Sequence, residues 1–228
     1  MDGYVQLDEI SRDILKEIGN VGTGNAVTSL SQMMEQPIEL DMPSLKVVKY
    51  YKMHELLEQP EELQTGILIE VTGQLKGIFL FMLSEAFTKT VINTILGEEE
   101  RNLTSLDDME CSLISELGNI MCGSYIRALS QLMDMDMDVS VPELCIDMGG
   151  AILTYPMSKW VIVSDDILLI ENIFHMSGEI FKGRILSGAG RFGNYAFTAQ
   201  GAALWIKSLW ESRKERLPGK IRCLYPMP

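Results

Sequence analysis

Two pairs of polar residues carry the chemistry that this sequence offers: Glu17 with Asn20, and Glu116 with Asn119. The members of each pair stand three positions apart, and the second pair follows the first by 99 positions. A carboxylate can bind a cation on a partner. An amide cannot act as a nucleophile or a base, but it can hold a water molecule in line for attack on another group. The pairs therefore suggest positioning rather than covalent catalysis.

Both pairs lie within a duplicated segment. Residues 17–45 and 116–144 align without a gap over 29 positions, and ten of these are identical. Unrelated segments would share about two identities at ordinary residue frequencies. The identities are Glu17/Glu116, Gly19/Gly118, Asn20/Asn119, Gly24/Gly123, Leu30/Leu129, Ser31/Ser130, Gln32/Gln131, Met34/Met133, Pro43/Pro142 and Leu45/Leu144. An internal duplication explains the match and divides the chain into two related halves.

A helix must position each pair. At 3.6 residues per turn, the polar positions fall on one narrow line along the helix, beside an apolar stripe. Ridge one consists of Asp13, Glu17, Asn20 and Gly24, and ridge two of Ser112, Glu116, Asn119 and Gly123. The expected buried stripes are Leu7, Ile10, Ile14, Ile18 and Val21 beside ridge one, and Met109, Leu113, Leu117 and Ile120 beside ridge two. Glu and Asn lie off both stripes, so core packing does not account for their recurrence.

Glycine and proline add to the pattern. Gly19, Gly22 and Gly24 each weaken a helix by up to about 1 kcal/mol relative to alanine, so their presence indicates that something approaches the backbone closely. Pro43 and Pro142 are expected at a sheet edge or strand start, because proline cannot donate to an interior ladder.

The same order of elements is predicted in both halves, giving an α+β fold in which each half has a long helix, antiparallel strands and a second helix. A pseudo-twofold axis should relate the two halves. Expected helices are 7–34, 52–57, 84–96 with Ser84 as N-cap, 104–133 capped by Thr104 or Ser105, and 194–210. Expected strands are 38–48, 66–71, 75–83, 137–148, 160–164, 167–175 and 179–186, with an irregular stretch before residue 160.

Composition narrows the function. The 228 residues carry a net charge of −13, with a pI near 4.6. Nucleic acid and anionic membrane surfaces are therefore excluded as partners, whereas a basic or metal-bearing protein suits the charge. No signal peptide or membrane span is evident, which predicts a cytoplasmic chain without membrane insertion. The four cysteines and two histidines suggest buried free thiols and form no zinc or nucleophile constellation.

The ridge residues and the following proline resemble the motif of the CheC/CheX/FliY family of chemotaxis phosphatases. The resemblance covers about residues 7–186 and is strongest to CheC members, which carry the motif twice. It implies hydrolysis of the phospho-aspartate of the response regulator CheY. Asn20 and Asn119 would orient the attacking water, and Glu17 and Glu116 would bind the partner's lysine. The chain would need no cofactor of its own, since Mg²⁺ would come with the partner.

The resemblance leaves further expectations open. CheD, a receptor deamidase, is a second candidate partner, and a non-catalytic chemotaxis or flagellar adaptor that binds CheD or CheY is the alternative function. A monomer is expected, with a phosphatase domain at 1–186 made of repeat one at about 7–97 and repeat two at about 104–186. Residues 187–228 form an atypical basic segment, and an altered reading frame near residue 187 is one hypothesis for it.

Overall fold

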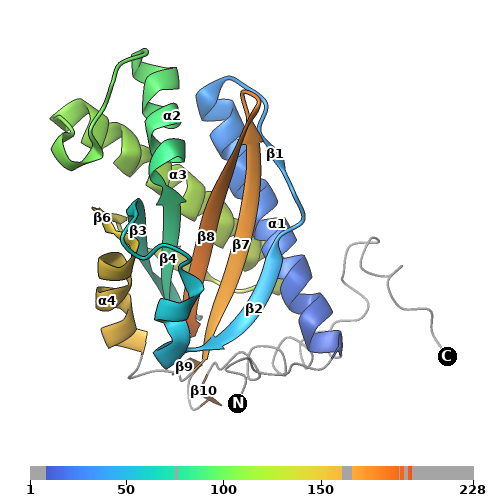
Figure 1. Cartoon of the computed structure of the whole chain (residues 1–228). Coiled ribbons are helices and arrows are strands. Elements are labelled where there is room, and N and C mark those ends of the chain that lie inside the picture. Colours follow the sequence, from blue (N-terminus) through green and yellow to red (C-terminus); the bar gives the residue numbers. More distant parts are fainter. Residues whose placement is uncertain (1–8, 75–76, 161–165, 190, 193–194, 197–228) are drawn as a thin grey trace.

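One antiparallel sheet of eight strands lies at the centre of the protein, with helices on both faces (Figure 1). The computed structural model describes residues 9–74, 77–160, 166–189, 191–192 and 195–196. The helices are α1 (Glu9–Met34), η1 (Tyr50–Leu56, 3-10), α2 (Glu85–Leu96), η2 (Leu103–Ser105, 3-10), α3 (Asp108–Met133) and α4 (Gly149–Trp160). The strands of the sheet are β1 (Glu39–Leu40), β2 (Ser44–Lys49), β3 (Leu63–Gly73), β4 (Gly77–Ser84), β5 (Met137–Val139), β6 (Glu143–Met148), β7 (Asp166–Met176) and β8 (Glu179–Ala189). A separate pair, β9 (Arg191–Phe192) and β10 (Tyr195–Ala196), completes the described elements.

The strand order follows the sequence repeat. From edge to edge the sheet runs β1 and β2, then β7, β8, β4 and β3, then β5 and β6. Each pairing in one half has a counterpart in the other: Leu45 faces Ile170 as Leu144 faces Ile67. The central strands β4 and β8 pair Phe81 with Ile185, the positions that correspond between the halves. A pseudo-twofold axis therefore passes between these two residues.

The edge strands are exchanged between the halves. Strands β1 and β2 follow α1 in sequence but pair with β7 of the second half. Strands β5 and β6 follow α3 but pair with β3 of the first half. The sheet is thus a single structure built from both repeats, not two sheets side by side.

Two hydrophobic clusters explain why the central strands are apolar on both faces. The larger cluster joins one face of the sheet to α1, α2 and α3 and includes Leu30, Phe81 and Tyr125. The smaller cluster joins the other face to η1 and α4 and includes Met53 and Ile152. Because both faces of β3 are covered, its residues 64–69 are all buried, a continuous run rather than an alternation.

Both long helices end in the same way. Glu35 and Asp134 adopt positive φ angles of 53° and 50°, the left-handed conformation that terminates a helix. The hydroxyl of Ser31 donates to the carbonyl oxygen of Gln36 at 2.5 Å, and that of Ser130 donates to the carbonyl oxygen of Met135 at 2.5 Å. The identity between Ser31 and Ser130 in the repeat therefore has a structural explanation.

Several predicted elements are confirmed. Ser84 caps α2, since its hydroxyl accepts from the backbone N–H of Phe87, and Gly97 follows the helix end. The hairpin between β7 and β8 turns on Ser177 and Gly178, both with positive φ, as a two-residue type I′ turn requires. Pro43 directly precedes β2, and Pro142 directly precedes β6.

Other predictions were wrong. Helix α3 begins at Asp108 rather than 104, because Asp107 caps it through a reciprocal capping box with Glu110. The stretch expected to be irregular before residue 160 is helix α4, which contains Pro156. The expected strand at 160–164 is wrong at Trp160, which ends α4, and its other residues lie outside the described part of the chain. The helix expected at 194–210 is wrong at residues 195–196, which form β10, and its other residues also lie outside the described part. Strand β8 continues to Ala189, beyond the expected boundary at 186.

Candidate functional site

The two ridges occupy the N-terminal halves of α1 and α3, which pack against each other. Their contacts lie further along both helices: the ring of Tyr125 covers Gly22, and the hydroxyls of Ser29 and Ser124 are 2.7 Å apart. Because the twofold axis passes through the helix pair, the helices run in opposite directions (Figure 1). The polar residues of the two ridges therefore lie on either side of the crossing.

Ridge two faces solvent. The side chains of Ser112, Glu116 and Asn119 are exposed, and in ridge one Asp13 is exposed while Glu17 and Asn20 are half-buried. The side chains of Glu17, Asn20, Glu116 and Asn119 make no hydrogen bond or ion pair with any other described residue. Among the described residues these four side chains have no polar partner, and the two in ridge two are the more exposed.

An open hollow of about 630 Å³ lies over ridge two. It is lined by Asp108, Cys111, Ser112, Ser115, Glu116, Asn119, Val141 and Pro142. The hollow therefore gathers the three polar ridge residues with the motif proline, although the proline follows Asn119 by 23 positions in sequence. Among the described residues, two carboxylates and no lysine or arginine line it, which suits a cationic group of a partner.

The floor of this hollow is made of two adjacent rows on α3. Asp108, Ser112 and Glu116 stand four residues apart, and Cys111, Ser115 and Asn119 form the neighbouring row. Ser112, Glu116, Asn119 and Pro142 were predicted from the sequence, whereas Asp108, Cys111, Ser115 and Val141 were missed. The helical spacing was a signal for the first three, and the position before Pro142 was a signal for Val141.

The glycines of the repeat serve two purposes. A methyl group at Gly22 would lie 2.5 Å from the Tyr125 ring, and one at Gly118 would lie 2.8 Å from Ile67, so these positions admit the fold's own side chains. At Gly24 and Gly123 nothing lies within 4 Å of the added atom. The close approach predicted from the glycines is therefore internal at Gly22, as it also is at Gly118, whereas Gly24 and Gly123 face open space.

Packing accounts for many of the identities between the halves but not for the ridge pairs. Leu30 and Leu129 are buried in the core, and Leu45 packs against Gly19. By contrast, Glu116 and Asn119 are exposed and unsupported by any described neighbour. Surface residues without a structural partner that recur in register are the strongest candidates for function.

The buried stripe of α3 differs from the prediction at one end. Leu117 is fully buried, and Leu113 and Ile120 are partly buried, as expected, but Met109 is 66% exposed in the first turn. Ile114 and Met121 are buried instead. The stripe is thus displaced slightly around the helix, which leaves the ridge residues outside the core.

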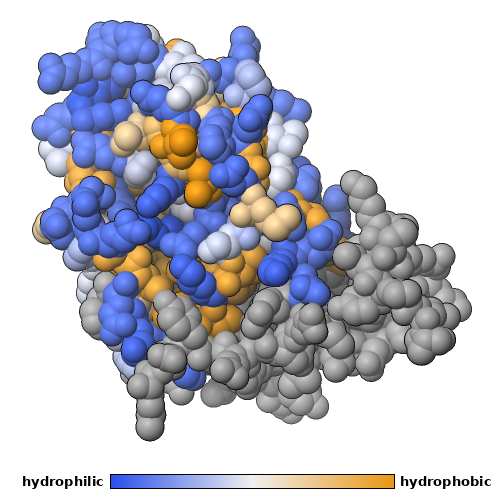
Figure 2. All heavy atoms as spheres, turned by 45° about the vertical axis from the view of Figure 1, so that its right-hand side comes forward, coloured by the Kyte–Doolittle hydropathy of each residue, from blue (hydrophilic) through white to orange (hydrophobic). Residues whose placement is uncertain are grey.

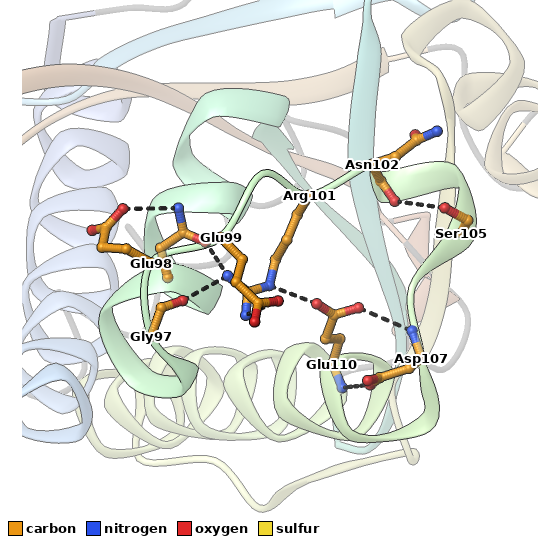
Figure 3. A network of polar contacts seen from close by, with 9 residues as sticks. Gly97, Glu98, Glu99, Arg101, Asn102, Ser105, Asp107 and Glu110 are labelled. Carbon is orange, nitrogen blue, oxygen red and sulfur yellow. Dashed lines mark hydrogen bonds and ion pairs between the residues drawn. The ribbon is translucent and has the colours of Figure 1, made fainter.

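A polar network fixes the start of α3 (Figure 3). Arg101 is almost wholly buried, and its Nε donates to Oε1 of Glu110 at 2.6 Å. The guanidinium also donates to the carbonyl oxygen of Gly97 at 2.7 Å and to the side chain of Asn93, both at the end of α2. The second carboxylate oxygen of Glu110 accepts from the backbone N–H of Asp107 at 2.9 Å. This network ties α2 to the first turn of α3 and so holds ridge two in place.

Within the described ranges, no group of three or more His, Cys, Asp or Glu side chains could hold a metal ion. Cys122 is buried as expected, and burial raises the pKa of its thiol. Cys145 is exposed, contrary to the prediction of buried thiols, and Cys111 is half-buried. Among the described helices, none is both long and apolar enough to cross a membrane.

Comparisons with known proteins identify a family and a shared fold. A family model described as the CheC-like family matches the chain twice, over residues 10–46 and 109–146. The CheY-P phosphatase CheC of Bacillus subtilis is 27% identical over 174 residues, which cover 75% of this chain and 83% of that protein. The CheY-P phosphatase CheX of Thermotoga maritima is 31% identical over 108 residues, 45% of this chain and 66% of that protein. The crystal structure of Thermotoga maritima FliY shares the fold, with a TM-score of 0.68 at 20% identity over 93% of this chain and 100% of that chain.

Proposed function

The chain belongs to the CheC-like family, and from this premise we propose that it hydrolyses the phospho-aspartate of a CheY-type response regulator. Relatives of both the CheC and the CheX type carry the name CheY-P phosphatase. The family model matches each half over its ridge and the following proline, so each half contributes one candidate site.

The observation that carries the proposal is the hollow over ridge two, where Asn119, Glu116 and Pro142 meet. Asn119 is exposed and its side chain has no hydrogen-bond partner among the described residues, so its amide oxygen and N–H groups can bind a water molecule. When a phosphorylated aspartate enters, the amide would hold that water in line with the phosphorus, as water-positioning residues do in phosphoryl transfer. The acyl phosphate is already reactive, so positioning alone supplies a useful acceleration.

The glutamates supply docking rather than chemistry in this proposal. Glu116, and Glu17 in ridge one, would each pair with a lysine beside the phosphorylated aspartate of the partner. The absence of lysine and arginine from the lining of the hollow supports this role, as does the net charge of −13. Opposite charges across such an interface chiefly raise the rate of association and fix orientation.

Any divalent metal would belong to the partner. Mg²⁺ held by the response regulator would neutralise the phosphoryl oxygens, which leaves this chain to provide water and orientation. The described residues of this chain offer a polar ridge rather than a set of metal ligands. We therefore propose that the chain carries no cofactor of its own.

The experiment measures phosphate release from a phosphorylated CheY-type regulator with and without the protein. We expect the wild type to accelerate release and the double variant Asn20→Ala with Asn119→Ala to reduce the acceleration by at least about 100-fold. Asn25→Ala is the matched control, since Asn25 is an exposed asparagine of α1 whose amide bonds only to the carbonyl oxygen of Val21 at 2.8 Å among described residues. A double variant as active as the wild type refutes the mechanism.

The same assay separates the alternative function. A chain that binds the regulator or CheD in a titration but leaves the rate of phosphate release unchanged is an adaptor, and its ridges then serve only for docking. Retention of both asparagines favours hydrolysis, because a docking surface alone does not require an amide at that position in both halves.

A further inference from the structure

Two large apolar side chains project into solvent at equivalent places in the halves. Met42 is 80% exposed and Val141 is 86% exposed, and the two positions are 99 residues apart, the offset of the repeat. Each stands immediately before the motif proline, Pro43 or Pro142. Neither residue belongs to the ridges.

The backbone holds these side chains outward. Each lies in the short connection between two edge strands, β1 and β2 in one half and β5 and β6 in the other. A following proline restricts the preceding residue to extended conformations, and Pro43 is itself buried, so the loop is anchored directly beneath Met42. Val141 and Pro142 form one wall of the hollow that contains Glu116 and Asn119.

Single exposed apolar residues are common and require no explanation. On the face shown in Figure 2, hydrophilic residues cover most of the described surface and hydrophobic atoms form separate small patches. Positions 42 and 141 differ from such scattered cases. The two halves have different residues at this position, methionine in one and valine in the other, yet both residues are apolar. A strongly exposed position that accepts different residues has no reason to remain apolar unless a partner covers it when the protein functions.

We infer that Met42 and Val141 are apolar contacts for the phosphorylated regulator. Val141 lines the same hollow as Glu116, the carboxylate proposed to bind the regulator's lysine. The inference rests on the proposed function for the identity of the partner. The hollow offers carboxylates on the helix side and an apolar wall on the loop side, so the complementary surface is a lysine flanked by an apolar side chain. Such a contact contributes affinity, whereas the amide contributes rate.

Parent variants in which only one ridge is active allow the two contacts to be tested separately. Val141→Ser is introduced with Asn20→Ala, so that only ridge two is active, and Met42→Ser is introduced with Asn119→Ala. In each background we expect the regulator concentration at half-maximal rate to rise about tenfold, as loss of a buried aliphatic contact predicts, with little change in the maximal rate. Val141→Ile should restore the half-saturating concentration, because it retains a branched apolar side chain.

Met148→Ser is the matched control. Met148 is 50% exposed at the far end of β6, about 23 Å from Val141 along the extended chain. Its substitution should therefore leave both the half-saturating regulator concentration and the maximal rate unchanged. Thermal unfolding of each variant checks that the fold is retained. The high exposure of both test positions predicts midpoints close to those of the parent proteins.

Direct titration with the phosphorylated regulator separates the possible failures. If the wild type binds but releases no phosphate, the proposed function fails, and weaker binding by the two serine variants still supports the contact. If the wild type is active and both variants bind and saturate like their parents, the inference alone fails. A fall in maximal rate at unchanged half-saturation would also overturn the docking role.

Discussion

The two ridges carry the same glutamate and asparagine on the same helical positions, yet they meet solvent differently. Glu116 and Asn119 are exposed beside an open hollow, whereas Glu17 and Asn20 are half-buried. The helix geometry is therefore common to both halves, and the surroundings are what distinguish them. A duplicated motif keeps its internal spacing easily, but its accessibility depends on neighbours that each half acquires separately.

The strands that follow the ridges also differ. In β2, Lys46 pairs with Glu171 at 2.5 Å, and Arg184 lies 3.7 Å from the same carboxylate. The corresponding positions in the other half are Cys145, Leu68 and Leu80, of which the two leucines are buried in the smaller cluster. Among the described residues, the strand after Pro43 thus has charged cross-strand contacts, and the strand after Pro142 has none at the corresponding positions.

The largest expected effect tests whether accessibility decides the share of activity. Each Asn→Ala change should lower the rate of phosphate release at its own site by about 100-fold, while the other site remains active. We expect Asn119→Ala to lower total phosphate release by about fivefold and Asn20→Ala to lower it by less than about twofold. Steady-state phosphate release measures both. Equal losses of phosphate release in the two variants would show that the difference in exposure does not affect activity.

The next effect concerns the network that holds ridge two. Arg101→Ala removes the partner of Glu110 and the link to Gly97, and should destabilise the protein by about 2 kcal/mol. Urea unfolding measures this change. Activity of ridge two, assayed with Asn20→Ala, should fall with the loosening of the first turn of α3, while ridge one, assayed with Asn119→Ala, should be unaffected. A matching fall at both ridges would contradict a local role.

Substitutions at two glycines of α3 should change the stability by smaller amounts and in opposite directions. Gly118→Ala places a methyl group 2.8 Å from Ile67 and should cost about 1–2 kcal/mol of stability. Gly123→Ala meets open space and should stabilise the helix by up to about 1 kcal/mol. Thermal unfolding compares the two variants. Destabilisation by Gly123→Ala would mean that the ridge backbone is less open than its surroundings indicate.

The smallest effect is the pH dependence of the charged strand. Burial alone would raise the pKa of Glu171, but the hydrogen bond and charge of Lys46, with the charge of Arg184, lower it below its ordinary value of 4.5. A lowered folded-state pKa gives stability that is present above 4.5 and lost as pH falls through the folded value. We expect Glu171→Gln to cost about 0.5–1 kcal/mol at pH 7, since the group is partly exposed, and less as the pH approaches 3. Urea titrations at several pH values measure this convergence, and a constant difference would contradict it.

Much of the fold follows from local sequence. The helix that carries ridge one, the Ser84 cap and the turn at Ser177 and Gly178 were predictable because each depends on neighbouring residues alone. The start of α3 was misjudged because Thr104, Ser105 and Asp107 are all good caps, and only Glu110 at the third helical position identifies Asp107. Helix α4 was missed because two glycines and Pro156 argue against a helix locally, whereas packing on the sheet favours it.

The candidate site was predictable in its residues but not in its setting. The repeat singled out Glu17, Asn20, Glu116 and Asn119, because identities at exposed positions stand out against those of the core. The apolar wall at Val141 and the exposure of Met109 depend on how a loop and a helix end are placed in space. Spacing within one helix cannot supply that information.

The exchanged edge strands have a consequence for how this chain came to exist. Each repeat leaves its own sheet incomplete and finishes the sheet of the other, as subunits do in a homodimer with swapped elements. Two copies of a single ancestral unit could build the same sheet before fusion joined them. Cleavage of the connection between α2 and α3 should then yield two fragments that remain associated, since the backbone ladders of β2 with β7 and of β6 with β3 hold them together.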